Sequence, residues 1–168
     1  MKFEHDAEVG QKVGFCEGLM MKVCIDTTVF IDVLKDESSG YQDKLYLALA
    51  RNEKLIAPVI VYGELMPQFK GNTQLLEAFL SDHRVEIEPL ETSAVSEAAQ
   101  RWMKYLARKK KLKCFQCGHA LEFKAHFLSD FFIGGFAVSR CDAILTRDRG
   151  IFKAYFPDLT GYENCLAD

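Results

Sequence analysis

Four acidic residues are placed where a parallel α/β sheet would bring them together. Asp26 ends the first predicted strand, and Asp148 follows the fourth by three residues. Glu64 lies about two turns into the helix predicted after the second strand, and Asp130 opens a later helix. In sheets of this kind, sites form beyond the carboxyl ends of the strands, which is where these carboxylates fall.

Carboxylates that converge repel one another and resist ionising together. A divalent cation removes this repulsion, and oxygen ligands suit Mg²⁺ or Mn²⁺. Such an ion can activate water for an in-line displacement at a phosphodiester. The shared placement of the acids therefore predicts a metal-dependent phosphodiester hydrolase. Each acid alone has a plainer explanation, since Asp130 can cap a helix and Asp148 can stand in a turn. For a fifth acid, Asp142, a structural role at the start of its strand is favoured over a place in the cluster.

The segments that must position these acids alternate between short apolar runs and longer amphipathic ones. Strands are predicted over 22–26, 54–57, 85–88 and 142–145, with a weak fifth over 159–162. Helices are predicted over 29–35, 41–52, 58–69, 73–81, 92–112, 129–139 and 148–155. Pro67 is expected to end or kink the third of these helices. The alternation predicts an α/β fold with three layers, α/β/α, around a central and mainly parallel sheet.

The length of 168 residues fits a single domain, predicted over 21–168. Residues 1–20 show little periodicity and are expected to form a flexible leader; an upstream start codon and an arm that covers a neighbour are the alternatives. The net charge of −3 excludes a strongly basic nucleic-acid coat but allows a local basic patch. The longest uncharged apolar runs are far shorter than the roughly 20 residues that span a bilayer. Cys24 and Cys141 are interpreted as small buried hydrophobes, and a reducing, cytoplasmic location is expected.

The acids and their neighbours resemble the motifs of the PIN domain, and most closely those of the VapC-type ribonucleases. The resemblance covers residues 22–160 and follows the order and spacing of four motifs. These are Asp26-Thr27-Thr28-Val29-Phe30, Glu64, Ser129-Asp130 with Ile133-Gly134, and Leu145-Thr146-Arg147-Asp148.

The resemblance implies an endoribonuclease that depends on Mg²⁺ or Mn²⁺, forms a homodimer and is often held inactive by a small antitoxin. The residues that match the family's metal-binding acids are Asp26, Glu64, Asp130 and Asp148. Thr146 would orient the site by hydrogen bonding through its hydroxyl. The chain departs from a minimal PIN domain by a Cys-containing insert near 113–126.

Within that insert, Cys114 and Cys117 form a CxxC pair, with His119 and His126 as the nearest further ligands. A structural Zn²⁺ needs four ligands, and the irregular spacing supplies only half of a standard knuckle. A turn with two free thiols is therefore the favoured interpretation, and a zinc site is the alternative.

Several basic residues are candidates for contact with RNA phosphates. The chain from Arg101 to Lys113 carries seven cations and no acid, and Lys110 lies in its densest part. A solvated helix end explains the same run, because cations suit a helix C-terminus. Arg147 and Arg149 flank Asp148, so either could hold the scissile phosphate.

Two other functions compete with the ribonuclease. A phosphatase of the haloacid dehalogenase type requires a second acid two positions after Asp26, and Thr28 stands there. A PIN-like RNA-binding or scaffold protein without catalysis fits the fold but not the presence of all four acids. An RNA processing or decay nuclease outside any toxin–antitoxin pair stays open.

Overall fold

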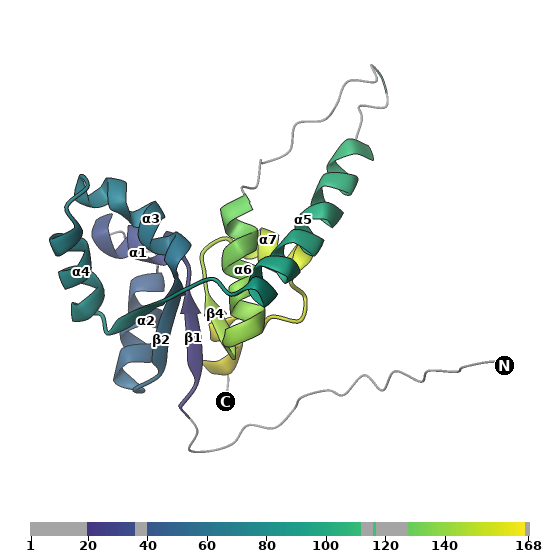
Figure 1. Cartoon of the computed structure of the whole chain (residues 1–168). Helices are drawn as coiled ribbons and strands as arrows, with labels where there is room; N and C mark the ends of the chain where they lie inside the picture. Colours follow the sequence, from purple (N-terminus) through teal and green to yellow (C-terminus); the bar gives the residue numbers. More distant parts are fainter. Residues whose placement is uncertain (1–19, 36–39, 112–115, 117–127, 167–168) are drawn as a thin grey trace.

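Four short parallel strands form a sheet at the centre of the molecule (Figure 1). The computed structural model describes residues 20–35, 40–111, 116 and 128–166, and the strands within them are β1 Lys22–Ile25, β2 Lys54–Pro58, β3 Val85–Glu88 and β4 Ala143–Leu145. Their order is β3-β2-β1-β4, with Cys24 opposite Ile56 of β2 and Ile144 of β4. Strands β1, β2 and β4 are mainly apolar, and all their residues except Lys22 and Lys54 are buried, since helices cover both faces of the sheet.

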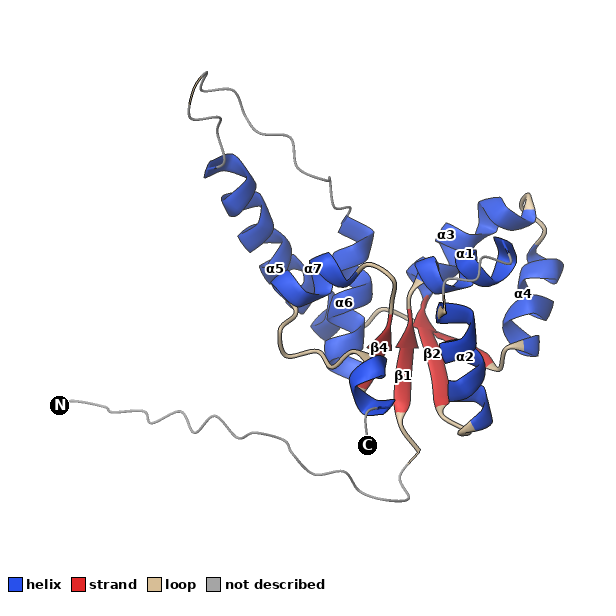
Figure 2. Cartoon of the chain, turned by 180° about the vertical axis from the view of Figure 1, so that it is seen from behind, coloured by secondary structure: helices blue, strands red, loops and turns tan. Residues whose placement is uncertain are grey.

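The helices form two groups, which cover the sheet from opposite sides (Figure 2). The first group is α1 Thr27–Lys35, α2 Tyr41–Ala50, α3 Val59–Leu65, the 3₁₀ turn η1 Met66–Phe69 and α4 Thr73–Asp82. The second is α5 Thr92–Lys111, α6 Leu128–Arg140 and α7 Arg149–Tyr155, and the 3₁₀ turn η2 Tyr162–Leu166 follows. The chain moves from β1 to β2 to β3 in one direction and then returns to β4. Because crossovers keep one hand, this reversal puts the second group on the other face. The predicted three-layer α/β/α fold is confirmed.

One predicted strand is absent from the described residues, and one predicted helix break is confirmed. The weak fifth strand over 159–162 is wrong: Gly161 makes an isolated parallel bridge to Ile144, and the chain then turns into η2. Tyr162, the first residue of this turn, is buried in the core. The break expected at Pro67 is confirmed, because α3 gives way there to a 3₁₀ turn. The predictions for residues 1–19 and for most of the insert lie outside the described residues.

The helices α5 and α6 pack closely because small residues face each other. A Cβ atom on Gly135 of α6 would lie 2.9 Å from the Cβ atom of Ala98 on α5, and closer still to the carbonyl oxygen of Ala94. No side chain fits at that distance without moving the backbone, so glycine at this position sets the spacing of the two helices.

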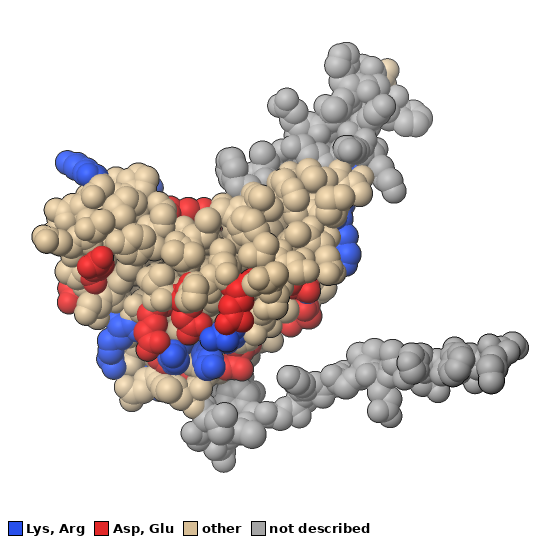
Figure 3. All heavy atoms as spheres, in the orientation of Figure 1, with Lys and Arg blue, Asp and Glu red and all other residues tan. Residues whose placement is uncertain are grey.

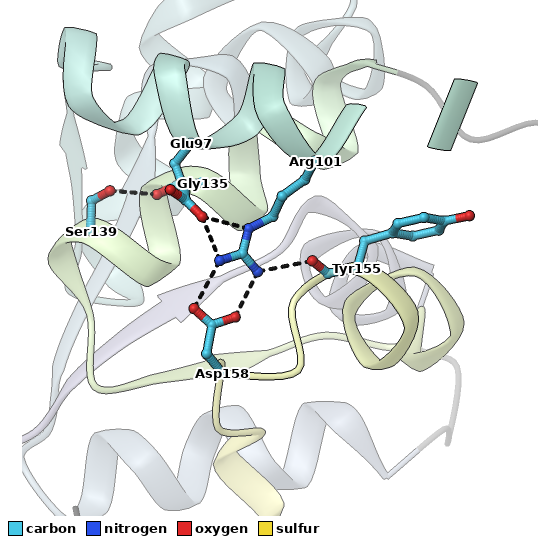
Figure 4. Close-up of polar contacts among 6 residues, drawn as sticks. All are labelled: Glu97, Arg101, Gly135, Ser139, Tyr155 and Asp158. Atoms are coloured by element: carbon cyan, nitrogen blue, oxygen red, sulfur yellow. Dashed lines mark hydrogen bonds and ion pairs between the residues drawn. The ribbon is translucent and has the colours of Figure 1, made fainter. Parts of the chain in front are cut away.

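Arg101 ties α5 to the segment that follows α7 (Figure 4). Its guanidinium donates to both carboxylate oxygens of Asp158, at 2.6 and 2.8 Å, and to the carbonyl oxygen of Tyr155 at 2.8 Å. Glu97, one helical turn earlier, accepts from Arg101 Nε at 2.6 Å. The guanidinium also lies over the ring of Phe156, 4.6 Å from its centroid. Arg101 is itself buried while Asp158 is exposed, so the network joins the core to the surface.

Acidic and basic side chains are interleaved on the face shown in Figure 3. Among the ion pairs, Lys54 lies 2.8 Å from Glu86, and Arg140 lies 3.1 Å from Glu88. This mixture agrees with the small net charge of the sequence. Within the described parts of the chain, no helix is long and apolar enough to cross a membrane.

Candidate active site

The candidate site lies where the order of strands reverses. β1 leads to β2 on one side, while its other neighbour, β4, comes from the far end of the chain. Helices therefore leave these two strands in different directions, and in open α/β sheets ligands bind at the carboxyl ends of such strands. Ile25 and Leu145 are opposite each other in the two strands, so the residues that follow, Asp26 and Thr146, lie side by side at this point.

Asp26 is held in place by two hydroxyl groups. Thr146 Oγ1 donates to Asp26 Oδ2 at 2.7 Å, and Thr28 Oγ1 donates to the same oxygen at 2.6 Å. The backbone N–H of Asp26 donates to the Leu145 carbonyl at 3.0 Å, which extends the β1–β4 ladder by one bond. Only 4% of the Asp26 residue is exposed. Burying an ionised carboxylate costs free energy even when hydroxyls bond to it, and such buried charges are common at functional sites.

Burial raises the pKa of Asp26 from 3.8 to about 6. The hydrogen bonds from Thr146 and Thr28 lower this pKa, since they favour the ionised form. The negative charges of Asp130 and Glu64 raise it again, so three of the four acids interact electrostatically. A buried carboxylate whose pKa is raised by further carboxylates is typical of sites that bind a cation or transfer a proton.

Glu64 and Asp130 approach Asp26 from the helices of opposite groups. Glu64 projects from α3, which directly follows β2, and the hydroxyl of Thr27 at the start of α1 donates to its Oε2. Asp130 stands in the first turn of α6, where a negative charge is favoured by the helix dipole.

Asp148 is linked to the same site through its backbone. Its N–H donates to Thr146 Oγ1 at 3.1 Å, so Thr146 accepts from Asp148 and donates to Asp26. Asp148 immediately precedes α7, yet its side chain makes no capping hydrogen bond to that helix. Asp142, by contrast, accepts from the backbone N–H of Lys22 at 2.8 Å, and its structural role beside the start of β1 is confirmed.

The donor set suits a hard divalent cation. Carboxylate and hydroxyl oxygens surround Asp26, and these are the ligands that Mg²⁺ and Mn²⁺ prefer over the thiolates and imidazoles that bind zinc. Among the described residues, no three His, Cys, Asp or Glu side chains are drawn together closely enough to coordinate one ion as they stand. The interaction is thus electrostatic at the present separations, and a cation would supply the attraction that draws the carboxylates closer.

The predicted basic residues differ in their surroundings. Arg147 forms an ion pair of 2.6 Å with Asp32 of α1, whose side chain is fully buried. Arg149 donates to the hydroxyl of Tyr41 and lies 2.8 Å from Glu163. The side chain of Lys110, together with the Cys114 and Cys117 pair, lies outside the described residues.

Sequence reasoning assigned no role to Thr27, Thr28 or Asp32. The first two were visible as hydroxyl residues directly after Asp26, at a position where hydroxyls can bond to neighbouring polar groups. Asp32 had a weaker signal, as an acid within the apolar stretch of α1. Its partner Arg147 lies 115 residues away, and no local pattern connects the two.

The family follows from comparison with known proteins. Residues 23–157 match the sequence model of the PIN domain. The chain belongs to the PIN domain family. The match includes all four acids, and the PIN domain accounts for the resemblance noted in the sequence. No curated protein matches the chain significantly.

Solved structures with the same fold include three VapBC complexes. A chain of DNA-bound VapBC from Salmonella typhimurium aligns with a TM-score of 0.60 and 21% identity, covering 84% of this chain and 96% of the other. VapBC2 from Rickettsia felis, bound to a promoter DNA fragment, aligns with a TM-score of 0.59 and 19% identity, covering 83% of this chain and 96% of the other. VapBC-1 from nontypeable Haemophilus influenzae aligns with a TM-score of 0.59 and 17% identity, covering 84% of this chain and 96% of the other. At these identities the likeness establishes the PIN fold.

Proposed function

We propose that this protein is a metal-dependent endoribonuclease of the VapC type, which hydrolyses phosphodiester bonds of RNA. The observation that carries the proposal is Asp26, a buried carboxylate at the carboxyl end of β1 that lies within the electrostatic influence of two further acids. Such an arrangement is unfavourable for stability, and a bound cation offsets that cost.

The site residues have distinct roles in this proposal. Asp26, Glu64, Asp130 and Asp148 would hold Mg²⁺ or Mn²⁺. When bound, such an ion would supply an activated water and offset the charge that develops on the phosphate. Thr146 and Thr28 fix the Asp26 carboxylate through their hydroxyls, so that little reorganisation is needed when the substrate binds.

A small antitoxin that covers the site is the proposed partner, and a homodimer in the cytoplasm is the proposed working form. The support for a partner is that all three similar structures described above are VapBC complexes. An uninhibited ribonuclease would harm its own cell, so we expect expression of this chain alone to arrest growth. Co-expression of the partner should restore growth.

The central test is cleavage of single-stranded RNA by the purified chain with Mg²⁺ or Mn²⁺, and its loss on chelation. Asp26→Asn should abolish cleavage while the fold persists, because the amide keeps the shape of the carboxyl group and still accepts the two threonine hydrogen bonds. Asp82→Asn is the matched control, since Asp82 is an exposed acid at the end of α4. Equal cleavage by wild type and folded Asp26→Asn would refute the assignment of the site. Metal-independent RNA binding without cleavage would favour the scaffold alternative.

A further inference from the structure

Two cationic side chains converge on one carboxylate beside the candidate active site. Arg149 Nη2 of α7 lies 2.8 Å from Glu163 Oε1, and Lys44 Nζ of α2 lies 3.0 Å from the same oxygen. Glu163 belongs to η2, so α2 meets here two elements, α7 and η2, that lie about 100 residues later in the chain. We call Arg149 and Lys44 the two-cation site. The single negative charge of Glu163 neutralises only one of the two positive charges of this site.

A buried tyrosine holds both cations in position. Tyr41 at the start of α2 is 9% exposed, and its hydroxyl accepts from Arg149 Nε at 3.2 Å. Lys44 Nζ lies over the same ring, 4.3 Å from the centroid, which is a cation–π contact. Because Tyr41 contacts both cations and holds their side chains in place, the binding of an anion loses less side-chain entropy.

The geometry of the two-cation site suits a phosphate group. Arginine presents a planar fork of donors that matches phosphate oxygens, and lysine adds a compact charge. The Arg149 side chain remains 61% exposed while it contacts Glu163, so an incoming anion can reach it from solvent.

The two-cation site also adjoins the acids. Arg149 directly follows Asp148, whose N–H donates to Thr146, and Thr146 in turn donates to Asp26. Arg149 is therefore one residue away in the chain from a proposed metal ligand.

We propose that Arg149 and Lys44 bind a backbone phosphate of the RNA strand beside the scissile bond, and that Glu163 occupies this place until the strand arrives. This inference rests on the ribonuclease function proposed above. A phosphodiester carries one negative charge, as the Glu163 carboxylate does, so the exchange leaves the local charge balance unchanged. Glu163 thereby acts as an internal competitor that weakens the binding of RNA.

The first test removes the competitor. Glu163→Gln keeps the size of the side chain and removes its charge, so it should tighten the binding of a short, labelled single-stranded RNA by about threefold, the scale of an exposed ion pair. Fluorescence anisotropy in EDTA measures binding without cleavage, and the readout is therefore independent of nuclease activity.

A matched control lies at the opposite edge of the sheet. Glu88 of β3 also forms ion pairs with one lysine and one arginine, with Lys54 Nζ at 4.0 Å and Arg140 Nη2 at 3.1 Å. Its side chain is 19% exposed, close to the 23% of Glu163. Glu88→Gln makes the same change in net charge, and we expect it to leave the affinity for RNA close to that of wild type.

The second test removes the cations. Lys44→Gln/Arg149→Gln should weaken binding and reduce the slope of log K against log salt by about 0.7 for each lost phosphate contact. Lys54→Gln/Arg140→Gln is the control with the same charge change. If Glu163→Gln fails to fold, this pair of double variants still decides the proposal.

The possible outcomes separate this inference from the proposed function. The proposal is overturned if Glu163→Gln binds RNA no more tightly than Glu88→Gln, or if both double variants weaken binding equally. It is also overturned if Glu163→Gln alters the affinity for inorganic phosphate and leaves RNA binding unchanged. A wild-type protein that fails to cleave RNA, with Glu163→Gln still tightening RNA binding, would refute the nuclease and support the site.

Discussion

Replacing Asp26 by asparagine should stabilise the metal-free protein while it abolishes cleavage. Burial raises the pKa of Asp26 from 3.8 to about 6, with further contributions from Asp130 and Glu64. Between these two pKa values the folded protein binds more protons at Asp26 than the unfolded chain does. The free energy of unfolding therefore falls as the pH rises through this window.

The size of the effect follows from the shift. A difference of about 2 pKa units, at about 1.4 kcal/mol for each, corresponds to roughly 3 kcal/mol lost by pH 7. Asp26→Asn cannot ionise and escapes this loss. The variant should thus exceed wild type by about 1 kcal/mol at pH 4.5 and by about 3 kcal/mol at pH 7.

Urea denaturation in EDTA at both pH values measures this difference, because chelation keeps cations from compensating the charge. Asp82→Asn is the control, and its difference from wild type should hardly change with pH, since Asp82 is exposed. A folded Asp26→Asn that is less stable than wild type at pH 7 would contradict the reasoning. So would a stability difference that is the same at pH 4.5 and pH 7.

Three further predictions concern the cation site and the packing of α5. Mg²⁺ or Mn²⁺ at about 100 times its dissociation constant should raise the free energy of unfolding by about 2.7 kcal/mol, measured as a higher melting temperature of wild type. An unchanged melting temperature would contradict the cation site. Gly135→Ala should destabilise by about 1–3 kcal/mol in urea, because a Cβ atom there meets the backbone of α5. Gly63→Ala should not destabilise the protein, because a Cβ atom at that position contacts no other atom. Arg101→Met should cost about 2 kcal/mol by losing its bonds to Asp158, whereas Arg108→Met on the exposed side of α5 should be nearly neutral.

Local patterns predicted the sheet and the positions of the acids well. Short apolar runs, Val23–Ile25 and Ala143–Leu145, end directly before Asp26 and three residues before Asp148, so these strands and their carboxyl ends could be predicted from the sequence. The order of strands was not predicted, because the hand of βαβ crossovers restricts the possible orders without selecting one.

Interactions between distant residues could not be predicted in this way. Arg101 and Asp158 are 57 positions apart, and nothing in either neighbourhood indicates that they pair. The final strand was predicted wrongly because its apolar residues are equally compatible with a turn. Burial of Tyr162 decided between them, and burial depends on the whole core. The same holds for Thr27, whose contact with Glu64 exists only once α1 and α3 are adjacent.

The bond between Asp26 and Thr146 joins residues that are 120 positions apart, so the candidate site cannot form until both have been synthesised. At about 5–20 residues per second, a ribosome needs roughly 6–24 s to extend the chain from the first of these residues to the second. Until β4 has emerged and paired with β1, Asp26 has no neighbour on that side and Asp148 has not yet reached the site. If the chain is the nuclease proposed above, a nascent chain would therefore be inactive during this interval, in which the proposed partner can meet the protein as it folds.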